Sequence, residues 1–291
     1  MREQLPEVPR ERILAEVQRR NTAPCVAWAA YHIRAIDPDA TMIVSPADHL
    51  ILREEVFRDA ILQGMDFVEE LPSLLTLGVK PTRAETGYGY IQIGDESKGT
   101  IRSVKTFTEK PNRELAQVFV DSGEFFWNTG IFIWKAGSII EAIKQYLPEV
   151  SIRFEACSDS FGRPGSEQVV QKQLAACPNI SIDVGIMEKA TNVYVLCTDF
   201  GWSDVGTWGS LYALSQKDTC ENVVLHGRAT CYDSHRNIVS TSEKKLVILD
   251  GLQDYIVTDS ENVLLICRKS EEQRIRQFVN DAKTRFGNEY T

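Results

Sequence analysis

The first 215 residues alternate short, continuously apolar segments with amphipathic helical patterns, and this alternation limits the fold more than any other feature. Thr41–Val44 and Leu74–Gly78 read as buried strands. Between them, apolar residues recur on one helical face at Val56, Phe57, Ala60, Ile61, Met65 and Val68. Apolar strands that alternate with helices indicate a sheet covered on both faces. We therefore predict an α/β fold with a Rossmann-like, mixed but mostly parallel sheet and helices on both faces.

The same reading extends along the chain. Further strands are predicted at residues 90–93, 101–107, 131–134 and 193–197, and helices at 23–35, 113–121, 138–146 and 168–175. From Asn222 to Arg268 only short strands and turns occur, with Asn recurring before apolar strands, which hints at a repeat. A helix from Ile275 ends at Gly287. We predict two domains, residues 1–215 and a β-rich domain of residues 216–291.

Charge and cysteine content narrow the class of protein. Lys and Arg number 32 against 41 Asp and Glu, a net charge of −9, which argues against a nucleic-acid partner. The seven cysteines are odd in number and form no C-x-x-C pair, as expected for a reducing, cytoplasmic location. The chain begins without an apolar run, and no segment approaches the ~20 apolar residues that span a bilayer. No signal peptide and no membrane partner are expected.

Two aspartates are candidate metal ligands. Asp48 follows a buried strand, where ligands bind in open α/β sheets, although capping of the next helix explains it equally well. Asp204 lies in Gly201–Trp208, among glycines and tryptophans that a helix cap alone does not require. One or two carboxylates together with substrate phosphates are what Mg²⁺ prefers.

Weaker signals mark other loops. Gly87 and Tyr88 open a strand through a Gly-aromatic loop that is either a ligand-approach loop or an ordinary turn. Glu109 and Lys110 end another strand, where Lys110 is suited to a phosphate and Glu109 to sugar hydroxyls, or the two form a surface ion pair. Asn128 offers an amide, or an Asn-Thr-Gly turn.

Two further segments complete the set. Arg20 and Asn21 precede an apolar helix, and this helix start is either an anion site or a plain cap. Asp183 and Lys189 add a carboxylate and a cation near the late strands.

Taken in order, these motifs resemble the nucleotidyltransferases that make nucleotide sugars, and most closely the mannose-1-phosphate guanylyltransferase family. The matching stretches are RNTAPC, SPADHLI, TGYGYI, FTEKP, FWNTGIFIW, SIDVGIMEK and GWSDVGTW. The resemblance implies transfer of a guanylyl group from GTP to mannose 1-phosphate, giving GDP-mannose and pyrophosphate.

The resemblance also implies roles for residues. Asp48 and Asp204 would bind Mg²⁺, Lys110 would contact the sugar phosphate, and these three form the catalytic set. Arg20 and Asn21 would lie near the nucleotide, with Lys189 also binding substrate. The sugar site would be shaped by Gly87, Tyr88, Glu109, Asn128 and Asp183.

One departure from the family leaves an alternative open. Family members begin with a Gly-rich phosphate loop of the type G-x-G-x-R-L, whereas the first glycine here is Gly64. The chain is therefore expected to start partway into the nucleotide-binding domain. The alternative function is a non-catalytic, nucleotide-sugar-binding or regulatory homologue. Related enzymes that use glucose or other sugar phosphates are only weakly excluded, and the β-rich tail is the candidate surface for a homodimer.

Overall fold

The computed structural model describes residues 4–161 and 167–290 and divides into two compact units. Unit 1 comprises residues 1–47 and 51–202, and unit 2 comprises residues 48–50 and 203–291. Each unit has apolar clusters of its own, so each is described separately. The domain boundary after residue 215 stays a prediction.

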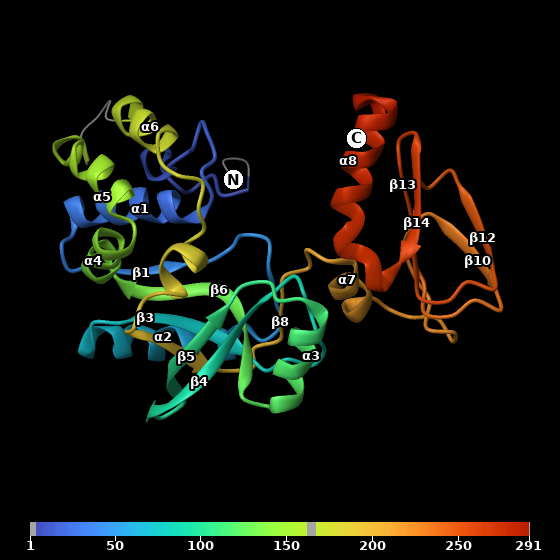
Figure 1. The fold of residues 1–291 in the computed structure, drawn as a ribbon, viewed down its shortest axis with the longest axis horizontal. Helices are drawn as coiled ribbons and strands as arrows, with labels where there is room; N and C mark the ends of the chain where they lie inside the picture. The colour runs from blue at the N-terminus through green and yellow to red at the C-terminus, as the bar shows by residue number, and fades with distance from the viewer. Residues whose placement is uncertain (1–3, 162–166, 291) are drawn as a thin grey trace. The chain divides into compact units, whose positions relative to one another are not determined.

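Unit 1 is built on a six-stranded sheet with the order β1-β6-β3-β7-β5-β4 (Figure 1). Its strands are β1 (Thr41–Val44), β3 (Leu74–Val79), β4 (Gly89–Lys98), β5 (Ile101–Thr108), β6 (Phe125–Lys135) and β7 (Val193–Cys197). All six predicted strands are present. The strand β6 is 11 residues long and pairs with β1, β3 and β4, so it connects the two halves of the sheet.

The α/β class and the mixed sheet are confirmed. The prediction that the sheet is mostly parallel is wrong, because most neighbouring strands run antiparallel. Among the printed pairings of this sheet, β3 and β7 are parallel, and the other pairs are antiparallel. The reason is that β6 runs back between β1 and β3, and β4 and β5 form a hairpin. An uninterrupted run of apolar residues indicates that a strand is covered on both faces. It does not indicate the direction of the strand.

Helices cover both faces of the sheet, as predicted (Figure 1). One face packs against α1 (Thr22–Ile36) and α4 (Ala136–Tyr146), and α5 (Pro148–Glu155) and α6 (Glu167–Ala175) pack against α1. Its core includes Trp28, Trp134 and Phe154, which are almost completely buried. The opposite face packs against α2 (Glu54–Glu70) and α3 (Arg113–Ser122), through Phe67, Phe119 and the strand residues facing them.

Unit 2 is β-rich and coils around a small core. Its strands are β9 (Val223–His226), β10 (Arg228–Tyr232), β11 (Ile238–Ser240), β12 (Leu246–Asp250), β13 (Tyr255–Ser260) and β14 (Val263–Arg268). Strands β9, β11 and β13 pair in parallel, β10 pairs in parallel with β12, and β14 closes the larger sheet antiparallel to β13. The helices α7 (Trp208–Leu214) and α8 (Ile275–Phe286) pack against the larger sheet.

Two of the recurring Asn residues, Asn222 and Asn237, form a buried ladder in unit 2. Asn222 Oδ1 accepts from the backbone N–H and the side-chain amide of Asn237, each at 3.0 Å. Asn237 in turn donates to the carbonyl of Leu252 and accepts from the N–H of Tyr255. Each Asn therefore links successive coils at the same position, which is what a structural repeat requires.

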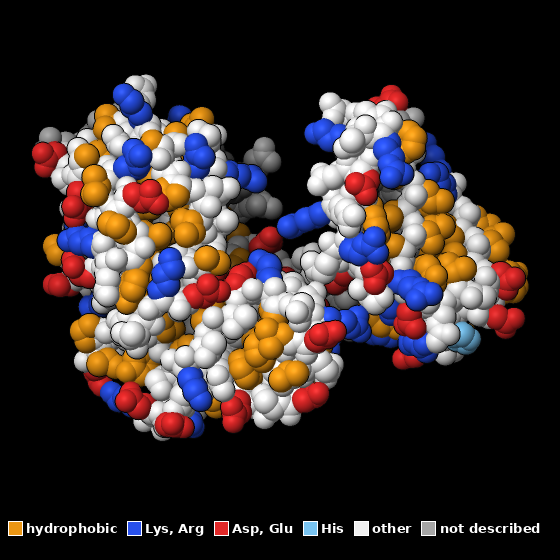
Figure 2. All heavy atoms as spheres, in the orientation of Figure 1, with side chains coloured by type: hydrophobic (Ala, Val, Ile, Leu, Met, Phe, Trp, Pro, Cys, Tyr) orange, Lys and Arg blue, Asp and Glu red, His pale blue; other side chains and the backbone are white. Residues whose placement is uncertain are grey.

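Charges of both signs are mixed on the surface, and the cysteines are unpaired. On the face drawn in Figure 2, acidic and basic side chains are interspersed over both units. The seven cysteines all lie within the described residues and are free thiols. No helix in the described part of the chain is long and apolar enough to cross a membrane.

Candidate active site

Four of the predicted site residues lie together in unit 1, next to the place where β6 pairs with the start of β4. Asn128 lies in the middle of β6 and pairs with Gly89, the first residue of β4. Glu109 and Lys110 directly follow β5, and Asp183 begins a short π-helical turn, Asp183–Met187. A Cβ added to Gly89 would lie 2.6 Å from Glu109 Oε2 and 3.3 Å from Asn128 Cβ, so the three residues are in close contact.

The Asn128 amide is held in one orientation. Its Oδ1 accepts from the Thr76 hydroxyl at 3.0 Å and from the Gly130 N–H at 3.2 Å. Its Nδ2 donates to Asp183 Oδ1 at 2.9 Å. A backbone N–H can only donate, so the Gly130 contact fixes which end of the amide is the oxygen. The side chain therefore presents its donor end to the carboxylates.

A lysine lies against these carboxylates. Lys110 Nζ contacts Glu109 Oε1 at 2.7 Å, while its side chain remains 63% exposed. The backbone N–H of Glu109 donates to Glu188 Oε1 at 3.2 Å. Lys110 has φ of 49°, an unusual backbone conformation for a residue with a side chain. The exposed ammonium is thus available to a ligand, and its position is set by the backbone turn.

Burial changes the protonation of Asp183. Loss of water contact raises the pKa of this carboxyl to about 6, and the negative charge of Glu109 adds to the effect. Hydrogen bonds from its own backbone and from Asn128 act in the opposite direction. Because the pKa lies close to neutrality, small changes in its surroundings decide whether Asp183 is an acceptor alone or also a donor.

The Gly-aromatic loop packs against the same cluster. The backbone carbonyl of Tyr88 accepts from the Lys110 N–H at 3.2 Å. The Tyr88 ring is buried edge-on against Trp127 and Trp202, with ring centroids 5.1 Å apart in both pairs. The backbone of the loop therefore borders the cluster, while the Tyr88 ring belongs to the core beneath it.

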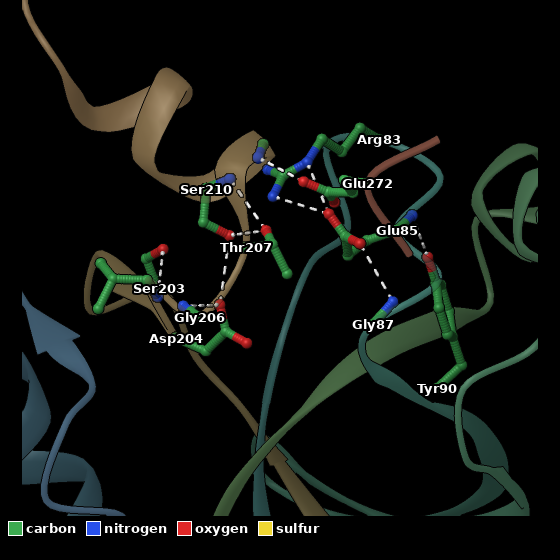
Figure 3. Close-up of polar contacts among 12 residues, drawn as sticks. Arg83, Glu85, Gly87, Tyr90, Ser203, Asp204, Gly206, Thr207, Ser210 and Glu272 are labelled. Carbon is green, nitrogen blue, oxygen red and sulfur yellow. Dashed lines mark hydrogen bonds and ion pairs between the residues drawn. The ribbon is translucent and has the colours of Figure 1, made fainter. Parts of the chain in front are cut away.

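Asp204 occupies a tight turn in unit 2 (Figure 3). Its Oδ1 accepts from the Gly206 N–H at 3.1 Å and from the Ser210 hydroxyl at 3.2 Å. The cap of helix α7 is Thr207, whose side chain accepts from the Ser210 N–H. Val205, which directly follows Asp204, has φ of 44°, a strained backbone conformation for a β-branched residue.

Asp48 belongs to the same compact unit as Asp204. The short strands β2 (Leu50–Ile51) and β8 (Trp202–Ser203) pair, and beyond them Leu52 N–H bonds Gly201 O and Arg53 N–H bonds Phe200 O. These contacts hold the chain just after Asp48 against the chain just before Asp204.

Neither aspartate caps a helix. The helix after Asp48, α2, has Arg53 as its N-cap and no side-chain cap bond. No group of three or more His, Cys, Asp or Glu side chains among residues 4–161 and 167–290 is arranged to hold a metal ion.

The remaining predicted residues lie elsewhere in unit 1. Asn21 is the N-cap of α1 and accepts from the Thr22 N–H at 2.9 Å. Arg20 Nη2 donates to the carbonyl of Ala175 at 2.5 Å. Thr22 Oγ1 accepts from the N–H of Ile182, which ties this helix start to the residue before Asp183. Lys189 is exposed.

Sequence reasoning missed two residues that support the cluster. Thr76 is fully buried within β3, where its hydroxyl reaches Asn128. Glu85 is buried at the start of the Gly-aromatic loop. Each carried a readable signal, because Thr76 is the one polar residue of an apolar strand and Glu85 is a charged residue directly before a Gly-aromatic loop.

The fold agrees with comparisons to known proteins. The sequence profile described as nucleotidyl transferase matches residues 2–221, and the chain belongs to this family of enzymes. A profile described as a MannoseP isomerase/GMP-like beta-helix domain matches residues 227–281, in agreement with the coiled strands of unit 2.

Within that family, the chain is similar to mannose-1-phosphate guanylyltransferases. It is 35% identical to the protein of that name from Escherichia coli K12 over 283 residues, covering 94% of this chain and 58% of the relative. A relative of the same name from Salmonella muenchen is 34% identical, with 96% and 59% covered. The chain thus spans less than two thirds of the length of these relatives.

A solved structure described as a mannose-1-phosphate geranyltransferase from Thermus thermophilus superposes with a TM-score of 0.78. It is 29% identical, and the match covers 94% of this chain and 78% of that one. The α/β fold with its β-rich C-terminal part is therefore shared with a solved protein.

Proposed function

We propose that the protein transfers a guanylyl group from GTP to mannose 1-phosphate in a Mg²⁺-dependent reaction that yields GDP-mannose and pyrophosphate. The observation that carries the proposal is the cluster of Glu109, Lys110, Asn128 and Asp183. It combines carboxylates and an amide, which suit sugar hydroxyls, with an exposed cation that suits a phosphate. The names of the similar proteins support the same pair of substrates.

The sugar phosphate binds with its hydroxyls toward the carboxylates and its phosphate toward Lys110. Ionised Asp183 and Glu109 accept hydrogen bonds from hydroxyls, and the Asn128 amide donates to them. Gly87 and Gly89 allow the backbone of the loop to approach the hexose closely. Tyr88 contributes through its backbone and through the packing of its buried ring.

The residues present fit a magnesium ion. Asp48 lies two residues before β2 and Asp204 directly follows β8, and these two strands pair. Two carboxylates completed by substrate phosphate oxygens match the preference of Mg²⁺. When bound there, the ion would neutralise charge on the phosphates.

The reaction is an in-line displacement at phosphorus. An oxygen of the sugar phosphate attacks the α-phosphorus of GTP, the bond from that phosphorus to the bridging oxygen breaks, and pyrophosphate leaves with the bonding electrons. Lys110 orients the attacking phosphate and offsets the repulsion between two anions. Arg20, Asn21 and Lys189 are the residues that we assign to the nucleotide and to further substrate contacts.

The experiment is an assay of GDP-mannose and pyrophosphate formation from GTP, mannose 1-phosphate and Mg²⁺. Lys110→Met is expected to lower kcat/KM for mannose 1-phosphate about 100-fold. Lys105→Met is the matched control, because Lys105 is an exposed lysine of β5, the strand that Lys110 follows. The activity of this variant should equal that of the wild type. Asp204→Asn should abolish the response to Mg²⁺.

The outcomes separate the two candidate functions. Binding of GDP-mannose without turnover would favour a non-catalytic nucleotide-sugar-binding protein, and absence of both binding and turnover would contradict the proposal. Glucose 1-phosphate, run in parallel, tests the identity of the sugar. The cytoplasmic location stays a prediction from the cysteine content.

A further inference from the structure

Glu85 is a buried carboxylate for which the proposed reaction has no direct use. Its side chain is 6% exposed and lies at the start of the loop that leads into β4. The Nε and Nη2 atoms of Arg83 donate to Oε2 at 3.3 and 3.2 Å, and the Gly87 N–H donates to Oε1 at 3.1 Å (Figure 3). A charge is retained in such a place only when it is paired and hydrogen-bonded, as it is here.

The backbone of Glu85 ties down the other end of the same loop. Its N–H donates to the Tyr90 hydroxyl at 2.9 Å, and the Tyr90 ring is completely buried (Figure 3). One residue therefore holds the loop at two points, through its side chain at Gly87 and through its backbone at Tyr90. This closes the Gly-aromatic loop into a fixed shape.

The Arg83 side of the ion pair rests on the aromatic core. The Arg83 guanidinium lies 5.3 Å from the ring centroid of Trp127 and 6.0 Å from that of Tyr88. Trp127 directly precedes Asn128 in β6 and pairs with Tyr90. The ion pair is thus packed against the strand that carries the Asn128 amide.

The loop held in this way borders the cluster of the proposed sugar site. Gly89 is so close to Glu109 and Asn128 that a side chain would not fit. The Tyr88 carbonyl accepts from the Lys110 N–H. A shift of the loop backbone would therefore move Glu109 and Lys110, or open a gap beside the hexose.

We propose that Glu85 is a positioning residue for sugar-phosphate recognition: with Arg83 it fixes the backbone of Gly87–Gly89 and, through that backbone, the places of Glu109 and Lys110. The inference rests on the proposed function. Glu85 itself touches no substrate, so its effect is on the sugar phosphate and not on the nucleotide.

The test compares binding of mannose 1-phosphate and of GTP by isothermal titration calorimetry in four proteins, with urea unfolding of each as a measure of stability. Glu85→Ala removes the side-chain contacts with Arg83 and with the Gly87 N–H. It is expected to weaken mannose 1-phosphate binding about tenfold. Glu85→Gln keeps an acceptor for the Gly87 N–H and should rescue part of that loss. Binding of GTP should stay within about twofold in both variants.

Ser151→Ala is the matched control for stability. Ser151 is a buried residue of α5 whose hydroxyl bonds the Tyr31 hydroxyl at 3.0 Å, and it packs on the other face of the sheet. This variant should bind both ligands as the wild type does.

Three results would overturn the inference. The first is a folded Glu85→Ala protein that binds mannose 1-phosphate like the wild type. The second is an equal weakening of both ligands that follows stability, with Ser151→Ala behaving in the same way. The third is a wild-type protein that does not bind mannose 1-phosphate, which would contradict the proposed function as well. This result is told apart from a failure of the inference alone because it is seen in the wild type, without any variant.

Discussion

Asp183 shows how much the surroundings of a single residue matter at this site. The pKa of an aspartate ordinarily lies at about 4. Burial and the nearby negative charge of Glu109 raise the pKa of Asp183 to about 6. The folded state therefore binds a proton that the unfolded state has already lost over the intervening pH range. Folding stability must fall as the pH rises through that range.

This gives a prediction for Asp183→Asn. The wild type should lose up to about 3 kcal/mol of unfolding free energy relative to this variant between about pH 4 and pH 6. Above that range the difference should be constant. Urea unfolding of both proteins at several pH values measures it, and a difference that is flat across the whole range would contradict the raised pKa.

At the residue scale, the sequence pointed to those side chains that stand out from their neighbours. Glu109 and Lys110 end a predicted strand and Asn128 precedes one, and a family resemblance ordered them into one site. Thr76 escaped notice because a lone hydroxyl in an apolar strand is read as part of the core. Its hydrogen bond to Asn128 spans residues 52 apart in the chain, and no local pattern reports such a pairing.

At the scale of elements, two helical glycines show how helices fit the sheet. Gly64 lies on the buried face of α2, where an added Cβ would come within 2.5 Å of Ile133 and 3.0 Å of Leu75. Gly137 lies in the first turn of α4, where an added Cβ would meet nothing within 4 Å. Both positions are glycines within a helix, but Gly64 is tightly packed and Gly137 faces open space.

We expect Gly64→Ala to destabilise the protein by about 1–2 kcal/mol, because overpacking outweighs the better helix propensity of alanine. Gly137→Ala should stabilise it by about 0.5 kcal/mol, since only propensity and chain entropy change. Thermal or urea unfolding of the pair decides the matter. Equal effects would show that packing against β6 is looser than described.

The asparagine ladder makes a second prediction at this scale. Asn237 is completely buried and bonds Asn222, Leu252 and Tyr255. Asn237→Ala leaves these partners unsatisfied and should cost about 2–4 kcal/mol. Asn262→Ala, at an exposed Asn that bonds the carbonyl of Glu289, should cost less than about 0.5 kcal/mol. A ladder of no structural value would give similar unfolding midpoints for both variants.

Helices and strands could be predicted where the pattern that marks them lies within a few neighbouring residues. Most strands and helices of unit 1 follow from apolar periodicity, although α5 was not predicted. The end of α8 follows from Gly287, which has φ of 98°. Strand direction depends on where the chain returns, as β6 does between β1 and β3, and periodicity does not contain that information. The parallel coils of unit 2 were visible only as a recurring Asn.

At the scale of the whole molecule, the two units have separate apolar clusters. We therefore expect two transitions in scanning calorimetry. Gly64→Ala should lower the midpoint of one transition and Asn237→Ala the midpoint of the other. A single transition that both variants shift equally would show that the units unfold together.

The turn at Val205 has a practical consequence for anyone who improves this protein by directed evolution. A branched side chain there opposes the backbone shape that presents the neighbouring carboxylate, and glycine would adopt that shape without strain. Libraries selected for heat tolerance alone would therefore drift toward glycine at this position and gain a more flexible turn beside the carboxylate. Screening for turnover in parallel is what would keep such a library useful.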